Sequence, residues 1–133
     1  AFLMPIVASM GGNAGMQTLA VTVRTIATND LTKNNFSSNV IKEFTIGILN
    51  GIIFAAISAF IVQVWFQDSI LSMIISLSMI LTMIVAGLFG IVVPITLKKM
   101  EIDPAIASSV FVTTITDVIG FVSFLGVSAY LLN

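Results

Sequence analysis

The sequence predicts an all-α integral membrane protein with four transmembrane helices per chain. Of its 133 residues, 58% are hydrophobic and 8% are charged, and the mean hydropathy is +1.15. Soluble domains carry about 25% charged residues, and a chain this short has too much surface to enclose so apolar a sequence in one core. The charged residues also separate long apolar stretches, each near or above the ~20 residues that a helix needs to cross a bilayer.

Four such stretches are the predicted spans of a single transmembrane domain covering residues 1–133. They lie at about 2–27, 40–66, 70–97 and 105–132. A bilayer allows only helices or closed barrels, and these stretches lack the alternation of barrel strands. The predicted connectors are a polar segment at 28–39, a few residues around Asp68, and a charged turn at 98–103.

In the first span, three glycines, an asparagine and a glutamine interrupt the apolar pattern between Ser9 and Thr18. Each glycine costs an isolated helix about 1 kcal/mol relative to alanine, so we expect this segment to line a cavity or to pack tightly on another helix. Packing alone is the alternative. The residues that share one helical face are Pro5, Ser9, Gly12, Asn13, Gln17 and Arg24.

Glycines at i,i+4 spacing occur in the first span, at Gly11 and Gly15, and in the second span, at Gly47 and Gly51. This spacing favours close approach between helices.

The last span carries a carboxylate near its middle, at Asp117. A charge at that depth costs several kcal/mol unless it faces water, a cation or a partner, so its default interpretation is functional. The alternative is a protonated Asp117 hydrogen-bonded inside the bundle. The polar and small residues that share its face are Ser109, Thr113, Thr116, Asp117, Gly120 and Ser123.

The turn before the last span reads Glu101-Ile102-Asp103-Pro104. Asp103 is a good N-cap and Pro104 a good first helical residue, so the pair is expected to start the helix. A second role for Asp103 and Glu101, as cytoplasmic-side cation contacts, stays open.

The five basic residues all flank the connectors at 28–39 and 98–103, whereas the opposite turn carries only Asp68. By the positive-inside rule those two connectors are cytoplasmic, and the start of the chain and its C-terminus lie outside. The protein is therefore expected to be a multi-pass protein of the cell membrane. The basic residues are Arg24, Lys33, Lys42, Lys98 and Lys99.

The chain contains no cysteine and no histidine. A thiolate zinc site, a cysteine nucleophile and the commonest general base are therefore excluded, and any bound metal must meet oxygen ligands, which suit hard cations such as Mg²⁺. An intramembrane aspartyl protease needs two facing aspartates, whereas one lies at that depth here. We predict no enzyme and, with a net charge of −1, no nucleic-acid partner.

Two motifs together resemble the transmembrane domain of the MgtE family of Mg²⁺ channels and transporters. The segment from Pro5 to Thr18, followed by Val23-Arg24, resembles that family's second transmembrane helix. Asp103-Pro104-Ala105 with the segment from Thr113 to Gly120 resembles its fifth helix. The motifs occur in the right order with two spans between them, so the resemblance covers essentially the whole chain, as the family's helices two to five.

The resemblance implies a homodimer in the lipid bilayer, with a pore on the two-fold axis lined by the first and last helices of this chain. Asp117 and its copy would hold a hydrated Mg²⁺, assisted by the backbone carbonyl of Thr113, and Asn13 matches the motif asparagine. Full-length members usually add a cytoplasmic regulatory region and a first helix, both of which we expect to lie outside this chain. The implied pore-lining residues are Ser9, Gly12, Asn13, Gln17, Ser109, Thr116 and Gly120.

The sequence thus predicts divalent cation transport, with Mg²⁺ as the transported ion, through a dimeric channel-like pore. One Asp117 per chain would make a poor site, but two across a symmetry axis offer two negative charges to one divalent ion. The alternatives are an ion-coupled Mg²⁺ exchanger and a membrane scaffold that transports nothing.

Overall fold

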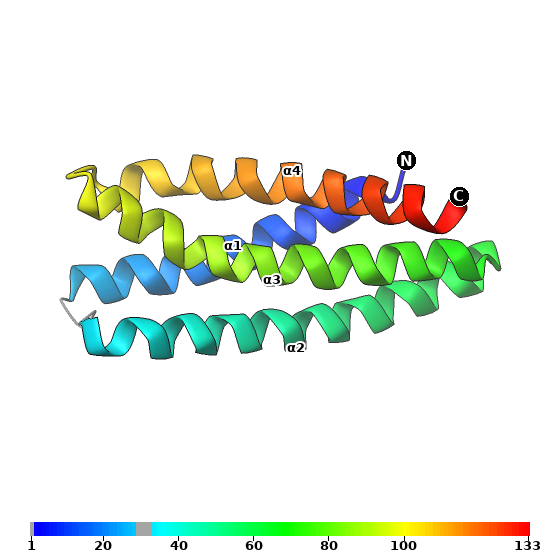
Figure 1. The fold of residues 1–133 in the computed structure, drawn as a ribbon, viewed down its shortest axis with the longest axis horizontal. Coiled ribbons are helices and arrows are strands. Elements are labelled where there is room, and N and C mark those ends of the chain that lie inside the picture. The colour runs from blue at the N-terminus through cyan, green and yellow to red at the C-terminus, as the bar shows by residue number, and fades with distance from the viewer. Residues whose placement is uncertain (1, 29–32) are drawn as a thin grey trace.

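The computed structural model of the chain describes residues 2–28 and 33–133, and these residues form four long helices (Figure 1). The helices are α1 (Met4–Ala27), α2 (Lys33–Phe66), α3 (Ser69–Lys99) and α4 (Pro104–Leu132). Successive helices run antiparallel, so the turn between α3 and α4 lies at the same end of the bundle as the end of α1 and the start of α2 (Figure 1).

The main difference from the predicted boundaries is at the start of α2. The sequence placed a polar connector at 28–39, whereas the helix begins at Lys33 and only residues 29–32 of that connector lie outside the described part. Apolar content indicates where a bilayer lies, not where a helix begins, because polar residues also form helices. With 34 residues, α2 is ~51 Å long, well beyond the ~30 Å of a hydrocarbon core.

Two helix starts are capped by an aspartate side chain, and the cap at Asp103 is the one that the sequence predicts. The Asp103 side chain accepts a hydrogen bond from the Ala105 backbone N–H at 2.9 Å, and Pro104 is the first residue of α4. At the other turn, Asp68 accepts from the Leu71 N–H at 3.0 Å and caps α3. The capping role predicted for Asp103 is therefore confirmed.

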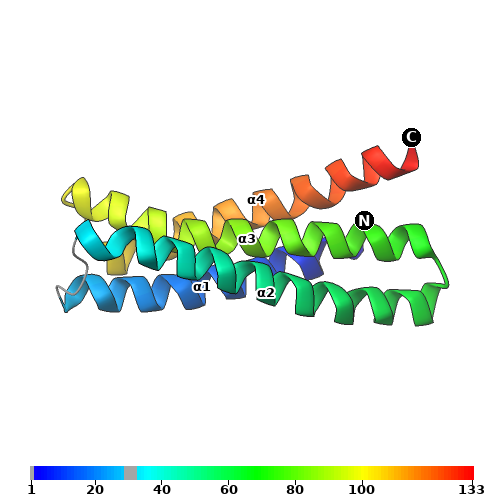
Figure 2. The ribbon, with the colours of Figure 1, turned by 60° about the horizontal axis from the view of Figure 1, so that its bottom comes forward.

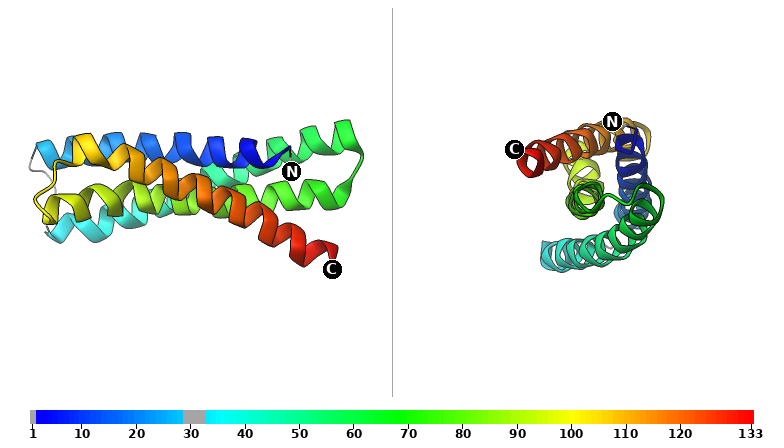
Figure 3. Two further views of the ribbon diagram at one scale, coloured as in Figure 1. Left: turned by 90° about the horizontal axis from the view of Figure 1, so that it is seen from above. Right: turned by 90° about the vertical axis from the view of Figure 1, so that its right-hand side faces the viewer.

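Helix α3 is the central element of the bundle. It packs against α1, α2 and α4, and α1 packs in addition against α4, whereas α1 and α2 hardly touch each other. Seen from the end, α3 lies between α2 and α4, with α1 along one side (Figure 3, right; Figure 2). Half of the residues in the most apolar stretch of α3 are buried, compared with 22% in the corresponding stretches of α2 and α4. The side chains that form the main core on α3 are Ile74, Ile75, Met79 and Met83.

The paired glycines lie at close helix contacts, as their spacing predicts. A Cβ on Gly11 would collide with the Thr82 side chain of α3, and one on Gly51 would come within 3.0 Å of the Ile80 Cα. On the other side of the α1–α3 contact, a Cβ on Gly90 would lie 2.9 Å from the Gly15 carbonyl oxygen. Larger residues at these positions would push the helices apart.

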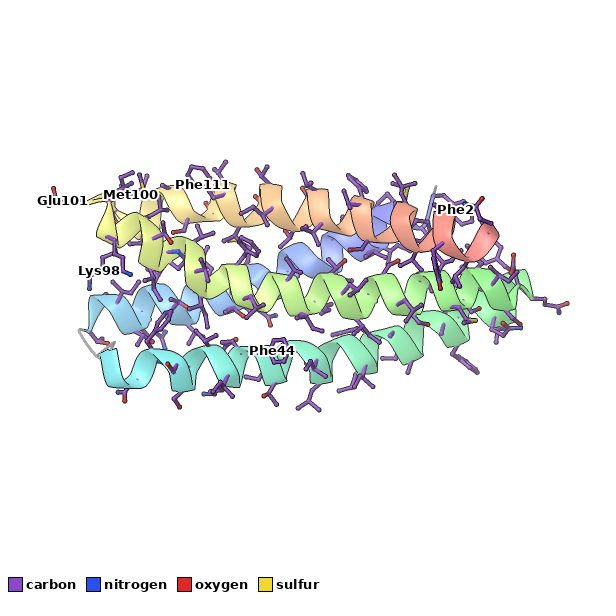
Figure 4. All side chains as sticks on the ribbon, in the orientation of Figure 1. Phe2, Phe44, Lys98, Met100, Glu101 and Phe111 are labelled. Atoms are coloured by element: carbon purple, nitrogen blue, oxygen red, sulfur yellow. The ribbon has the colours of Figure 1, made fainter. Side chains whose placement is uncertain are left out.

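Three of the helices are long and apolar enough to cross a membrane: residues Asn35–Phe66 of α2, α3 and α4. Among the described residues, α1 is not apolar enough to meet the same criterion. Its glycines, Asn13, Gln17 and Arg24 lower its mean hydropathy. Apolar side chains cover much of the outer surface; Phe44 and Phe111 are both exposed (Figure 4).

Charged groups gather at one end of the bundle. Lys98 and Glu101 lie at the α3–α4 turn (Figure 4), and Arg24 lies in the last turn of α1, at the same end. The turn at the opposite end carries Asp68. The structure thus keeps the charge asymmetry on which the predicted orientation depends.

Candidate functional site

Asp117 lies near the middle of α4 and its side chain is exposed on the surface of the single chain. The helix around it is apolar enough to cross a membrane. No hydrogen bond or ion pair to the Asp117 carboxylate is found within residues 2–28 and 33–133. This carboxylate is therefore presented outward, at mid-helix, with no partner among the described residues of its own chain.

The contact between α1 and α4 places Asn13 beside this region. Thr116 is fully buried against the glycines of α1: a Cβ on Gly12 would lie 3.7 Å from the Thr116 hydroxyl, and one on Gly15 would lie 3.3 Å from its methyl group. Asn13 follows Gly12 and Asp117 follows Thr116, and both side chains are exposed. The α1–α4 contact thus brings the two predicted motifs together, at the level of Asp117.

The predicted backbone ligand, the Thr113 carbonyl, already has a partner. It accepts a hydrogen bond from the Thr116 hydroxyl at 3.0 Å, while the Thr113 hydroxyl donates to the Ser109 carbonyl at 2.9 Å. A carbonyl oxygen has two lone pairs, and the helical N–H of Asp117 also points toward this one. A cation at the Thr113 carbonyl would therefore compete with the Thr116 hydroxyl.

The predicted pore-lining residues separate into four groups, of which the last is Gln17 alone. Ser9 and Asn13 lie exposed on α1, whereas Thr116 and Gly120 lie inside the α1–α4 contact and face no open space in the single chain. Ser109 lines a cavity of about 210 Å³ between α1 and α4, next to Met16, Ala20 and Pro104, and Gly12 is half-buried nearby.

Gln17 lies away from that cavity. It lines a different cavity, of about 180 Å³, between α1 and α2. The possible cation contacts Asp103 and Glu101 are both exposed at the α3–α4 turn, and Glu101 has a positive φ of 60°.

The structure adds one polar group that the sequence analysis does not single out. Glu43 lies about ten residues inside α2, and its carboxylate accepts a hydrogen bond from the Thr18 hydroxyl at 2.9 Å. Its position within the predicted 40–66 span is the signal that could have found it. In the described part of the chain, no three acidic side chains come together as a metal site.

Comparison with known proteins identifies the family. The sequence pattern of the family MgtE, described as a divalent cation transporter, matches residues 4–127. The magnesium transporter MgtE of Bacillus subtilis (strain 168) is 32% identical over 128 residues, which are 96% of this chain and 28% of that protein. The magnesium transporters MgtE of Enterococcus faecalis and Thermus thermophilus are 30% and 31% identical over 97% and 100% of this chain.

The chain spans only 28% to 29% of the length of these relatives. The match nevertheless includes both motifs, from Pro5 to Thr18 and from Asp103 to Gly120, and it runs through all four helices. The matched family is one of transporters rather than enzymes. The chain therefore belongs to the MgtE family of divalent cation transporters.

Proposed function

We propose that the chain forms half of a dimeric pore that conducts Mg²⁺ across the membrane, with α1 and α4 of both copies lining it. The observation that carries the proposal is the exposed carboxylate of Asp117 in the middle of an apolar helix. A charge at that depth facing lipid costs several kcal/mol, so it needs water, a cation or a partner chain. A pore on a two-fold axis supplies all three.

The charges support a dimer rather than a single chain. One Asp117 offers one negative charge, whereas two offer two to a hydrated Mg²⁺, which binds through one or two carboxylates and keeps several waters. Asn13, exposed beside the α1–α4 contact, would add amide oxygens from each chain. The Thr113 carbonyl would join the site by sharing its lone pairs with the Thr116 hydroxyl.

The same arrangement makes α1 a fourth membrane span. Its polar residues lower its hydropathy, but in this proposal Ser9 and Asn13 line the pore and Gln17 faces the cavity between α1 and α2, so they do not meet lipid. The end of the bundle that carries Arg24 and Lys98 would face the cytoplasm, which places the C-terminus outside. Mg²⁺ is the favoured ion because the relatives are magnesium transporters by name and because the side chains offer oxygen ligands.

The exposure of Asp117 argues against the scaffold alternative. A protonated aspartate that merely holds helices together would have a hydrogen-bond partner within the bundle, and the described residues provide none to Asp117.

The exchanger alternative differs from the channel in its driving force. A dependence of Mg²⁺ flux on a Na⁺ or H⁺ gradient would therefore favour the exchanger over the channel.

Transport assays in liposomes loaded with a Mg²⁺ indicator test the proposal. The complete protein that carries this chain should admit Mg²⁺, and Asp117→Asn, which removes the charge and keeps the shape, should reduce the rate at least about tenfold. Asp68→Asn is the matched control, because asparagine retains the N-cap of α3 at the far turn. Unchanged flux in Asp117→Asn would contradict the pore assignment.

A further inference from the structure

A cavity with several polar side chains in its lining lies between α1 and α2, with α3 as its floor, apart from the Asp117 region. Its volume is about 180 Å³, and its polar lining comes from the side chains of Gln17, Thr18, Glu43 and Asn50. Gly47 and Gly87 line it as well. The cavity therefore combines one carboxylate with two amides and a hydroxyl, which are the oxygen ligands that hard cations accept.

The carboxylate in this cavity is held by one hydrogen bond from a buried hydroxyl. The Thr18 hydroxyl, on a residue only 8% exposed, donates to Glu43 Oε2 at 2.9 Å. Among the described side chains, Thr18 is the one hydrogen-bond or ion-pair partner of this carboxylate. The group is half-buried and open to the cavity, and no basic side chain of the described residues forms an ion pair with it.

Two glycines of α3 set this geometry. A Cβ on Gly87 would lie 3.1 Å from the Glu43 carbonyl oxygen, and a Cβ on Gly90 would lie 2.7 Å from the Thr18 Cβ. One helix thus positions both members of a hydrogen bond between α1 and α2, which otherwise hardly touch.

The position of Glu43 along the bundle is well inside the helices. It lies ~15 Å beyond the first residue of α2, and Thr18 lies ~14 Å before the last residue of α1. A smaller cavity of about 40 Å³ continues from Glu43 toward the charged end, lined by Thr22, Thr25 and Asn39 and by Lys42. On the other side, Gln17 is one helical turn from Asn13 on the same face of α1.

We propose that this cavity is a second, off-axis binding site for a hydrated divalent cation, between the charged end of the bundle and the Asp117 site. Glu43 supplies the charge, Gln17 and Asn50 supply amide oxygens, and Thr18 is a positioning residue that orients the carboxylate. A water occupies ~30 Å³ in the liquid, so the cavity has room for an ion that keeps most of its waters, as Mg²⁺ does. The ion class follows from the proposed function.

The test uses Mn²⁺, a divalent probe that oxygen ligands also accept and that anomalous X-ray scattering locates. Crystals of the complete protein, and of its Asp117→Asn variant, should both show a Mn²⁺ peak in the cavity beside Glu43. Glu43→Gln should lose that peak and keep the fold, because the glutamine amide oxygen still accepts the Thr18 hydrogen bond. Thr18→Val should weaken Mn²⁺ binding at this site about tenfold, as expected for loss of a ligand-orienting group.

Thr45→Val is the control for Thr18→Val, because the exposed Thr45 on α2 donates only to the Ile41 carbonyl of its own helix. A peak between the Asp117 carboxylates with none beside Glu43 would overturn this inference and leave the proposed function intact. Unchanged Mn²⁺ occupancy in Glu43→Gln would also overturn it. A peak beside Glu43 together with normal flux in Asp117→Asn would instead retain this site and remove the proposed pore.

Discussion

Gly120 of α4 lies directly against Ala8 of α1. A Cβ on Gly120 would come 2.8 Å from the Ala8 Cα and 3.1 Å from its backbone nitrogen. These are backbone atoms that cannot rotate away, so this contact fixes the separation of α1 and α4 one turn from Asp117. The geometry of the proposed pore wall depends on that separation.

We expect Gly120→Ala to force α1 and α4 apart. The added methyl group overpacks the contact, which costs about 1–3 kcal/mol, and it displaces Asn13 relative to Asp117. The midpoint temperature of unfolding, measured in detergent, and the rate of Mg²⁺ flux, measured in liposomes, should both be lower than in the parent protein.

The control for this variant is Gly126→Ala on the same helix, where a Cβ meets nothing within 4 Å. It should keep the flux and gain up to about 1 kcal/mol of helix propensity. Equal behaviour of the two alanine variants would show that the α1–α4 contact does not set the site.

The Thr116 hydroxyl and a cation compete for the Thr113 carbonyl in this account. Thr116→Val removes the hydroxyl and keeps the shape of a fully buried side chain. We therefore expect half-maximal transport at a lower Mg²⁺ concentration, measured by titrating Mg²⁺ in the liposome assay.

Thr114→Val is the matched control, since the exposed Thr114 hydroxyl donates to the Val110 carbonyl of the same helix. If both valine variants reach half-maximal transport at the same Mg²⁺ concentration as the parent protein, the Thr113 carbonyl is not a ligand.

Two substitutions at Asp103 separate the contribution of its helix cap to stability from the contribution of its charge. Asp103→Ala removes the side-chain acceptor for the Ala105 N–H and should lower the free energy of unfolding by about 1 kcal/mol. Asp103→Asn keeps the cap and should unfold like the parent in a thermal scan in detergent. A loss of stability as large in the asparagine variant would show that charge, and not capping, is what Asp103 contributes.

Much of the fold follows from the sequence because apolar runs and turn chemistry are local signals. The helix start at Asp103 follows from a capping residue before a proline, and the glycine pairs correctly indicate close contacts. The start of α2 does not follow, because all but one of residues 33–39 are polar and a helix there extends beyond the apolar stretch.

The sequence also groups Thr116 with Asp117 on one polar face. Neighbouring helical residues differ by about 100° in direction, and the structure buries Thr116 while it exposes Asp117. A polar stripe marks a side of a helix, but packing partners decide which residues of the stripe stay open. For the same reason the sequence does not single out Glu43: its partner Thr18 is on another helix, and sequence spacing carries no information about that contact.

The central claim is that two copies of Asp117 share one divalent cation. An anomalous-scattering map of the dimer with Mn²⁺ tests it most directly, because it locates the ion without reference to transport. We expect one peak on the two-fold axis, between the two Asp117 carboxylates and within reach of both through direct or water-mediated contacts. Two Asp117 side chains turned toward lipid or away from each other, with no peak between them, would contradict it.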